Sequence, residues 1–167
     1  LTGSNMCTIS KTAGIATGTL YIYFTNKEEL ITALFTKCRN ESAAFYLKDY
    51  APEESFEKNF RKIFMNVLEY RRQHFREFVF LEQCYHSPFI SADLRRKSLK
   101  KLQALYLLLD KGKKEGISKD LDNALLLGYF LGAIGEVVKR AWYNKQSINK
   151  ETIDSLYHLC LDGLKKK

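Results

Sequence analysis

The sequence contains little proline and glycine and no long stretch without charged residues. Among its 167 residues there are only two prolines and nine glycines, which disfavours a loop-rich β protein and suits long helices. Apolar residues make up 46% of the chain, enough to form a buried core. No run approaches the roughly 18 uncharged residues of a membrane span, and no secretory signal pattern is present. We therefore expect a globular helical protein of the cytoplasm.

The chain also lacks closely spaced metal ligands. The four cysteines, Cys7, Cys38, Cys84 and Cys160, are far apart and include no CxxC pair. The three histidines show no HxxxH or HExxH spacing. These spacings provide neither a disulfide framework nor a zinc site, so we expect reduced thiols, no metal and no cofactor.

Motifs that would indicate an enzyme are missing as well. There is no phosphate-binding glycine loop and no Gly-x-Ser-x-Gly sequence. Glu82, Cys84 and His86 are close in sequence, but on a helix Cys84 points away from the other two. We therefore expect no catalysis. A thiol-based redox sensor centred on Cys84 remains an alternative, and a helical protein-interaction module that does not bind DNA is a third possibility.

The net charge of +8 would suit a polyanionic partner, yet most of it lies outside the N-terminal segment. Residues 1–47 carry four basic and three acidic side chains, a net charge of +1, so the other +7 lies beyond residue 47. A function for the N-terminal segment must therefore be argued from its local motif and not from the total charge.

Apolar residues recur with helical spacing along the chain, and no alternating pattern of a β-strand is sustained. The regular stripe Phe56, Phe60, Ile63, Phe64, Val67 and Leu68 is one example. The pattern predicts an all-α fold, with a helix-turn-helix domain and linker helix in residues 1–47 and a helical bundle in residues 48–167. One continuous helix is expected to start at Ser91 and Asp93 and to close at Gly112 or Gly116.

The segment around Gly14 has the pattern of a helix-turn-helix. Gly14 can adopt the left-handed conformation that ends a first short helix, and Thr17 can cap a second one. The apolar residues expected between the two helices are Ile9, Ala13, Ile15, Leu20 and Phe24.

Hydroxyl side chains and one glycine occupy the outer face of the predicted second helix. Threonine and tyrosine hydroxyls are suited to phosphate oxygens and base edges, and a glycine allows a close approach of the backbone to another surface. The residues expected on this face are Thr17, Gly18, Thr19, Tyr21 and Tyr23. Ordinary packing without a nucleic acid is the alternative interpretation.

Lys27 stands in the first turn of the next predicted helix, after the expected cap Asn26 and with Glu29 as the partner in a capping box. A cation at this position opposes the helix dipole at a cost of about 0.3–1 kcal/mol. A DNA phosphate at the start of the helix would reverse that effect, so we expect Lys27 to contact the DNA backbone.

The sequence ISKTAGIATGTLYIYFTNKEEL, Ile9 to Leu30, closely resembles the DNA-binding segment of TetR-type (TetR/AcrR) transcriptional regulators. The resemblance implies that the second helix is the recognition helix and that Thr8 and Lys27 lie near the flanking phosphates. The complete protein would then have about eight to nine helices. One further helix would precede this motif, so we expect the first helix to be missing before Leu1.

The resemblance further implies that the C-terminal body binds a small effector and forms a homodimer through its last two helices. The implied function is a ligand-responsive repressor that leaves a palindromic DNA operator when the effector binds. In this hypothesis the effector shifts the helix that begins at Lys27 and so changes the separation of two DNA-binding heads.

The residues themselves suggest where the effector and the second protomer would bind. Residues 121–142 are apolar on nearly every face, which favours a shared interface over a monomeric core. The predicted dimer residues are Leu125, Gly128, Gly132, Gly135, Trp142, Leu156 and Leu159. The predicted effector-binding residues are Phe60, Phe64, Phe78, Glu82, Tyr85, Tyr106 and Tyr129.

The sequence leaves the chemistry of the effector open. An aromatic cavity with one acid, Glu82, would suit a flat cation. The basic surplus of the C-terminal half favours an anion instead. A filled core, with Glu82 in solvent or paired with an arginine, is the alternative to any effector site.

Overall fold

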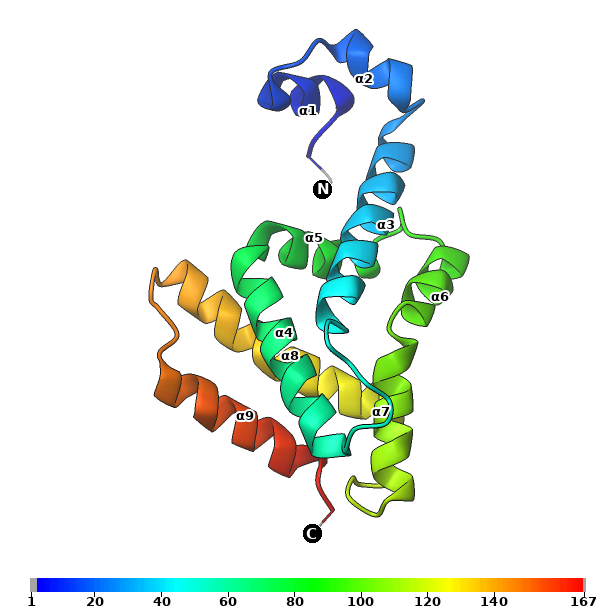
Figure 1. The fold of residues 1–167 in the computed structure, drawn as a ribbon. Helices are drawn as coiled ribbons and strands as arrows, with labels where there is room; N and C mark the ends of the chain where they lie inside the picture. The colour runs from blue at the N-terminus through cyan, green and yellow to red at the C-terminus, as the bar shows by residue number, and fades with distance from the viewer. Residues whose placement is uncertain (1–2, 167) are drawn as a thin grey trace.

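The computed structural model describes residues 3–166, and it is helical throughout (Figure 1). These residues form nine helices and no strand, which confirms the expected all-α fold. The only β-type pairing among them is one isolated bridge between Ser118 and Lys165.

Two short helices form a small head at one end of the molecule (Figure 1). Helix α1 (Met6–Ala13) and helix α2 (Thr17–Tyr23) are followed by the long helix α3 (Lys27–Tyr46), which runs from the head into the body. Since α3 ends next to the expected domain boundary at residue 47 but packs along α4 and α5, the head and the body share this helix.

Helix α4 (Phe56–Gln73) forms the centre of the body. Its predicted apolar stripe is buried from Phe56 to Leu68, against helices α3, α7 and α8. Each fully buried phenylalanine in such a stripe contributes about 1.5–3 kcal/mol. The surrounding helices are α5 (Phe75–Tyr85), α6 (Ala92–Lys100), α7 (Gln103–Lys114), α8 (Asn123–Tyr143) and α9 (Lys150–Leu164).

The expected single helix from Ser91 to Gly112 or Gly116 is wrong, because the chain bends between α6 and α7. At the bend the amide of Lys101 donates to the Ser98 carbonyl and the amide of Leu102 donates to the Leu99 carbonyl, at 3.2 and 2.9 Å. These shorter-range bonds tighten the turn and end α6 without a glycine or proline. The bend therefore had no local sequence signal.

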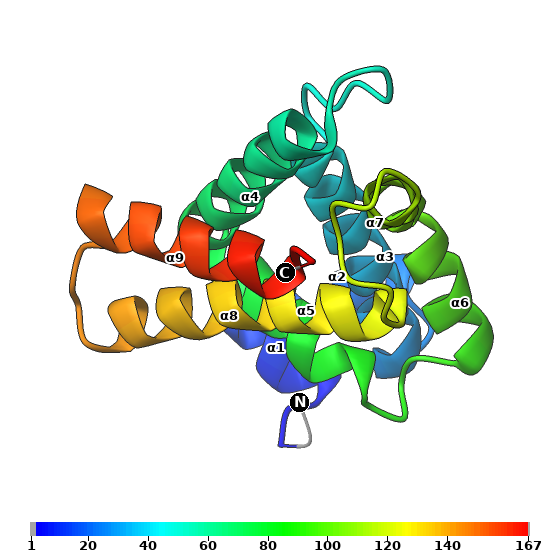
Figure 2. The ribbon, with the colours of Figure 1, turned by 90° about the horizontal axis from the view of Figure 1, so that it is seen from below.

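Helices α8 and α9 form a hairpin that extends from one side of the body (Figure 2). Asp122 caps α8 through the amides of Ala124 and Leu125, and Asn149 caps α9 through the amide of Thr152. The Tyr129 hydroxyl donates to the Leu159 carbonyl at 2.8 Å and ties the two helices together.

Candidate functional sites

The turn between α1 and α2 has the geometry of a helix-turn-helix. Gly14 has a positive φ of 69° and ends α1, as the sequence predicted. Its amide donates to the Lys11 carbonyl at 3.1 Å, and the amide of Ile15 donates to the Ser10 carbonyl at 3.0 Å. These bonds fix the direction in which α2 leaves α1.

Thr17 does not cap α2, contrary to the sequence-based expectation. The cap position is Ala16, which makes no side-chain hydrogen bond, and Thr17 is the first residue of the helix. The Thr17 hydroxyl instead lies 2.7 Å from the hydroxyl of Ser10, which is fully buried on α1. Thr17 therefore joins the two helices.

The apolar contact between α1 and α2 is smaller than expected. Leu20 and Met6 are buried, whereas Ile9 and Phe24 are half-buried and Ile15 is 41% exposed. Leu20 is the one large apolar side chain of α2 that is buried, so it is the main residue that holds this short helix against α1.

The outer face of α2 is open to solvent. Gly18, Thr19, Tyr21 and Tyr23 are all exposed, Tyr23 by 71%. A Cβ at Gly18 would have no neighbouring atom within 4 Å, so nothing within residues 3–166 requires a glycine there. Helical glycine costs about 1 kcal/mol relative to alanine, and an external surface that approaches the backbone would account for it.

The sequence reasoning missed Ile22 on this face. Its side chain is 78% exposed, the highest value among the large apolar residues of positions 3–166. A β-branched apolar side chain at this position suits contact with a thymine methyl group. The signal was available, because Ile22 is adjacent to Tyr21 and Tyr23 and falls outside the buried spacing of Leu20 and Phe24.

Thr8 and Lys27, the residues expected near phosphates, both have partners within the chain. Thr8 is exposed, and its hydroxyl donates to the Asn5 carboxamide oxygen at 3.0 Å. The Lys27 ammonium donates to the Ser4 carbonyl and lies 5.4 Å from the centre of the Phe89 ring. These contacts offset the unfavourable helix dipole at Lys27, so the dipole argument does not require a phosphate.

The start of α3 is capped on two sides. Asn26 accepts from the amide of Glu29 at 2.9 Å, as expected. The Glu29 carboxylate accepts from the hydroxyl and the amide of Thr25, each at 2.7 Å, rather than from Asn26. The Thr25 hydroxyl, followed by the Thr25 amide, lowers the pKa of Glu29, and this carboxylate thereby orders the connection between α2 and α3.

A cavity of about 700 Å³, here called the aromatic cavity, lies in the body. Its volume falls within the range of about 300–1,000 Å³ that is common for small-molecule sites. Four of the predicted effector residues line it together: Phe78, Glu82, Tyr85 and Tyr106. The other lining residues include Arg39, Tyr46, Arg71, His86 and Leu131.

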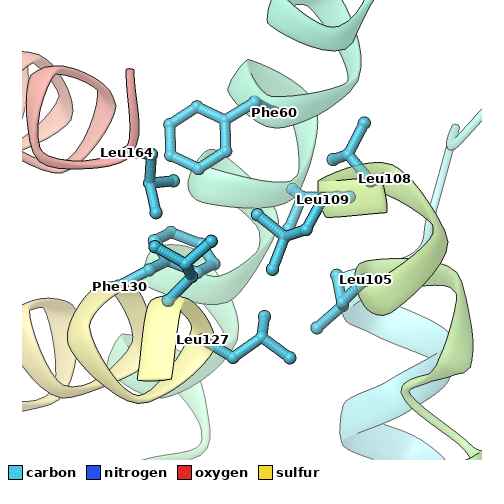
Figure 3. Close-up of a pocket in the computed structure, with 9 residues that line it drawn as sticks. Phe60, Leu105, Leu108, Leu109, Leu127, Phe130 and Leu164 are labelled. Carbon is cyan, nitrogen blue, oxygen red and sulfur yellow. The ribbon is translucent and has the colours of Figure 1, made fainter. Parts of the chain in front are cut away.

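Phe60, Phe64 and Tyr129 do not line the aromatic cavity. Phe60 borders a separate void of about 10 Å³, packed among leucines and Phe130, which has room for about one water molecule (Figure 3). Phe64 is fully buried against Tyr157. The Tyr129 ring lies over Gly163 at the surface between α8 and α9. These three side chains pack the fold.

The aromatic cavity has more positive than negative charge. Arg71 is 6% exposed, donates to the Leu131 carbonyl, and stacks over Phe78 at 4.5 Å. Arg39 has a buried Nε without a hydrogen-bond partner, and burial lowers the pKa of its guanidinium. Glu82, the acid of the cavity, is 3.3 Å from the Lys139 ammonium. The two arginines were missed, although Arg71 interrupts the apolar pattern that follows Leu68.

The predicted dimer residues divide into a surface group and a buried group. Leu125, Leu159 and Trp142 are 60%, 65% and 50% exposed. Gly128 and Gly132 are exposed as well, and a Cβ at either would have no neighbour within 4 Å, although Gly128 also lines the aromatic cavity. This part of α8 and α9 leaves apolar side chains and open backbone at the surface.

Gly135 and Leu156 lie inside the protomer and not at the expected interface. A Cβ at Gly135 would be 2.8 Å from the Arg71 Nη1 atom and 3.1 Å from the Phe78 ring. Gly135 thus lets α8 approach the wall of the aromatic cavity. Leu156 is 6% exposed and belongs to the main core.

The thiols are mostly inaccessible. Cys84 and Cys160 are fully buried, and burial raises the pKa of each to about 11. Burial also raises the pKa of Cys38, while Cys7 is exposed. A raised pKa disfavours the reactive thiolate at neutral pH, which argues against a redox sensor centred on Cys84.

Neither a metal site nor a membrane span is found within residues 3–166. No three or more His, Cys, Asp or Glu side chains lie together there in an arrangement that could hold a metal ion. In the same part of the chain, no helix is both long and apolar enough to cross a membrane.

Comparison with known families gives two matches that together span almost the whole chain. Residues 3–34 match the model of bacterial regulatory proteins of the tetR family. Residues 25–166 match the model of the tetracyclin repressor-like C-terminal domain. The first match covers the head, and the second covers α3 and the body.

Individual relatives agree with these matches. Over 71 residues, 42% of this chain, the sequence is 31% identical to the uncharacterized HTH-type transcriptional regulator YhgD of Bacillus subtilis, and the match spans 37% of that relative's length. A TetR family transcription regulator from Marinobacter aquaeolei has a TM-score of 0.89 at 21% identity, covering 100% of this chain and 87% of the other. FadR from Bacillus subtilis, solved in complex with stearoyl-CoA, has a TM-score of 0.69 at 23% identity, covering 96% and 89%.

The thiol environments predict selective alkylation. In the native protein at pH 8, iodoacetamide should modify Cys7 within minutes and leave Cys84 and Cys160 unmodified, because their thiolate fraction is small and they are buried. Mass spectrometry of peptides before and after unfolding measures this. Fast modification of Cys84 in the folded protein would restore the redox-sensor alternative.

Proposed function

The chain belongs to the TetR family of bacterial regulatory proteins, and from this premise we propose that it is a ligand-responsive repressor. The family makes it a DNA-binding transcription regulator. In the proposal, it occupies a palindromic operator as a homodimer and leaves it when a small effector enters the aromatic cavity. The observation that carries the proposal is that α3 both begins at the head and lines this cavity with Arg39 and Tyr46.

The proposed DNA contact is the outer face of α2. Its exposed Thr19, Tyr21, Ile22 and Tyr23 offer hydroxyl donors and one apolar side chain, and Gly18 leaves the backbone open. Hydroxyls and amides near the start of α2 would position the helix on phosphates, while the side chains farther along would read base edges. Thr8 and Thr17 contribute mainly through contacts within the head, to Asn5 and Ser10, and Lys27 ties the start of α3 to Ser4.

The proposed dimer interface is the exposed face of α8 and α9. Leu125 and Leu159 supply apolar area, while Gly128 and Gly132 allow two copies of α8 to approach closely. A symmetric pair would place two heads on half-sites about 34–36 Å apart, one turn of DNA. Trp142 stacks on Phe75 at 4.2 Å and would extend this face toward the end of α8.

The proposed effector is an elongated apolar molecule with a negative charge. Phe78, Tyr85 and Tyr106 provide the apolar wall, and Arg39 and Arg71 provide the cations. Because Glu82 is already paired with Lys139, it is not available to bind a flat cation, and the flat-cation hypothesis is disfavoured. The likeness to FadR, solved with stearoyl-CoA, supports a fatty acyl compound as the first class to test.

Effector binding would act on the head through packed helices. Ile31, Phe35 and Cys38 of α3 are buried against Leu81 and Cys84 of α5, and α5 lines the aromatic cavity. A ligand that displaces α5 or Arg39 therefore moves α3 and the head with it. Affinity for the operator falls because two half-sites can no longer be reached together.

The first test is Tyr23→Ala on an operator obtained by selection from random duplex DNA. Loss of one base-edge contact is expected to weaken binding about tenfold, consistent with about 1–3 kcal/mol for such contacts. The melting temperature should stay nearly constant because Tyr23 is 71% exposed. Tyr23→Phe is the control that separates the hydroxyl from the ring. Unchanged affinity in a folded Tyr23→Ala dimer contradicts the proposed contact.

The second test is Leu125→Glu. A charge on each copy of this 60% exposed side chain would face its symmetry mate, so the variant should become a monomer and lose operator affinity more than tenfold. Leu107→Glu, at a 54% exposed position of α7, is the matched control and should stay dimeric. Light scattering after size exclusion measures the mass, and a dimeric Leu125→Glu variant contradicts the interface.

The third test compares laurate with dodecyltrimethylammonium, which carry alkyl chains of the same length and opposite charges. Below their micelle concentrations, laurate should bind about tenfold more tightly and release the operator in gel shifts, because Arg39 and Arg71 line the cavity. Tighter binding of the ammonium compound would favour a cationic effector. Binding of either compound without any loss of operator affinity would contradict the repressor mechanism.

A further inference from the structure

A second cavity lies between α3 and α6, beside the aromatic cavity. Its volume is about 540 Å³, and we call it the anion cavity. Figure 1 shows α6 next to the lower half of α3, with the bend into α7 below it. The lining residues are Phe35, Thr36, Arg39, Asn40, Leu94, Lys97, Ser98, Lys100 and Lys101.

The charges of the anion cavity are all positive. Arg39, Lys97, Lys100 and Lys101 line it, and the described lining residues include no carboxylate. Lys97 is paired with Asp93 at 2.7 Å, and Asp93 also binds Arg96. No ion pair joins Lys100 or Lys101 to a carboxylate elsewhere in residues 3–166. Repulsion among these cations around one cavity is unfavourable unless a bound anion neutralises them.

The helix dipole accounts for only part of this arrangement. Lys97 and Lys100 are in the last turn of α6, where a cation is favourable. Arg39, however, comes from α3, more than 50 positions earlier in the chain, and is not part of the last turn of α6. The preference of a helix end for cations therefore does not explain why Arg39 lies beside these lysines.

Two buried polar groups in the wall have no hydrogen-bond partner in the part of the chain that the structure describes. They are the Nε of Arg39 and the hydroxyl of Ser98, whose residue is 4% exposed. Buried polar groups are normally paired, and an unpaired one costs about 1–3 kcal/mol. Arg39 also lies 5.8 Å from the centre of the Phe35 ring, which holds its stem but supplies no acceptor. An incoming acceptor would satisfy groups that the fold leaves open.

Arg39 lines both the anion cavity and the aromatic cavity. The aromatic cavity is lined mainly by aromatic and aliphatic side chains, whereas four of the nine residues that line the anion cavity are cations. A molecule that ran past the Arg39 guanidinium would therefore pass from an apolar to a strongly positive environment. This polarity suits an amphiphile with an apolar chain and an anionic head.

We propose that the anion cavity binds the phosphate groups of a phosphorylated amphiphile, of the acyl-coenzyme A class, whose acyl chain lies in the aromatic cavity. Lys100 and Lys101 contact the phosphates from the α6 side, and Arg39 contacts the junction between head and chain. A polyphosphate head matches several clustered cations, whereas a single carboxylate would engage only Arg39 or Arg71. The inference rests on the proposed function of the aromatic cavity as an effector site.

The test measures binding of stearoyl-CoA, stearate and free coenzyme A by calorimetry without DNA. Lys100→Ala/Lys101→Ala should weaken stearoyl-CoA about tenfold and leave stearate within about twofold, because it removes phosphate contacts alone. Lys113→Ala/Lys114→Ala is the matched control, with the same loss of charge on α7 outside both cavities. All four lysines are at or near helix ends, and melting temperatures verify that each variant folds.

Several outcomes would overturn the inference. The first is that stearoyl-CoA does not bind the wild type. The second is that Lys100→Ala/Lys101→Ala weakens binding of stearate and stearoyl-CoA equally. The third is that the control variant loses as much affinity for stearoyl-CoA as Lys100→Ala/Lys101→Ala does. The proposed function is judged separately by gel shifts. Stearoyl-CoA that binds through Lys100 and Lys101 but leaves operator affinity unchanged would contradict the repressor mechanism while supporting the anion cavity. Release of the operator by stearate but not by stearoyl-CoA would support the repressor mechanism and contradict the anion cavity.

Discussion

The structure depends on the packing of one helix that the head and the body share. Helix α3 has 20 residues, so at 1.5 Å per residue it is about 30 Å long. Its first turn holds the head through Asn26, Lys27 and Glu29, and its middle packs Phe35 onto α5. Because a packed helix moves as a unit, contacts near Arg39 and contacts in the head are physically connected. Through α3 the head and the body are thus packed as one unit and are not two modules joined by a flexible linker.

The second organising feature is the positive charge beneath the surface of the body. Arg71 is stabilised by the Leu131 carbonyl and the Phe78 ring, which belong to the fold itself. Arg39 lacks such compensation at its Nε, and burial lowers its pKa. Removing a cation from water without pairing it is unfavourable, and proteins accept that cost mainly at binding sites. This contrast between two neighbouring arginines is the reason to regard Arg39 as the residue that meets a ligand.

Local rules predicted much of the fold and the head, while side-chain partners depended on tertiary contacts. Gly14 could be identified because a left-handed helix end strongly favours glycine, and the α4 stripe because its spacing admits only one buried face. The partner of Thr17 is seven residues away, and the neighbour of Gly135 is on α4, so no local pattern revealed either. Arg39 was missed since a lone arginine in a helix is ordinarily a surface residue.

The composition of α2 has a consequence for the dynamics of the free protein. Seven residues, including a glycine in the first turn, are too few to form a stable helix alone, and Leu20 is the only side chain of α2 that is fully packed. Local opening of this helix should therefore require much less free energy than global unfolding, so its amides should exchange hydrogen far sooner than those of α4. Part of the free energy of binding a duplex would then be used to order the helix. The free energy used to order α2 lowers the affinity for every DNA sequence by the same amount. Selectivity among sequences then depends on the few side chains that contact the bases.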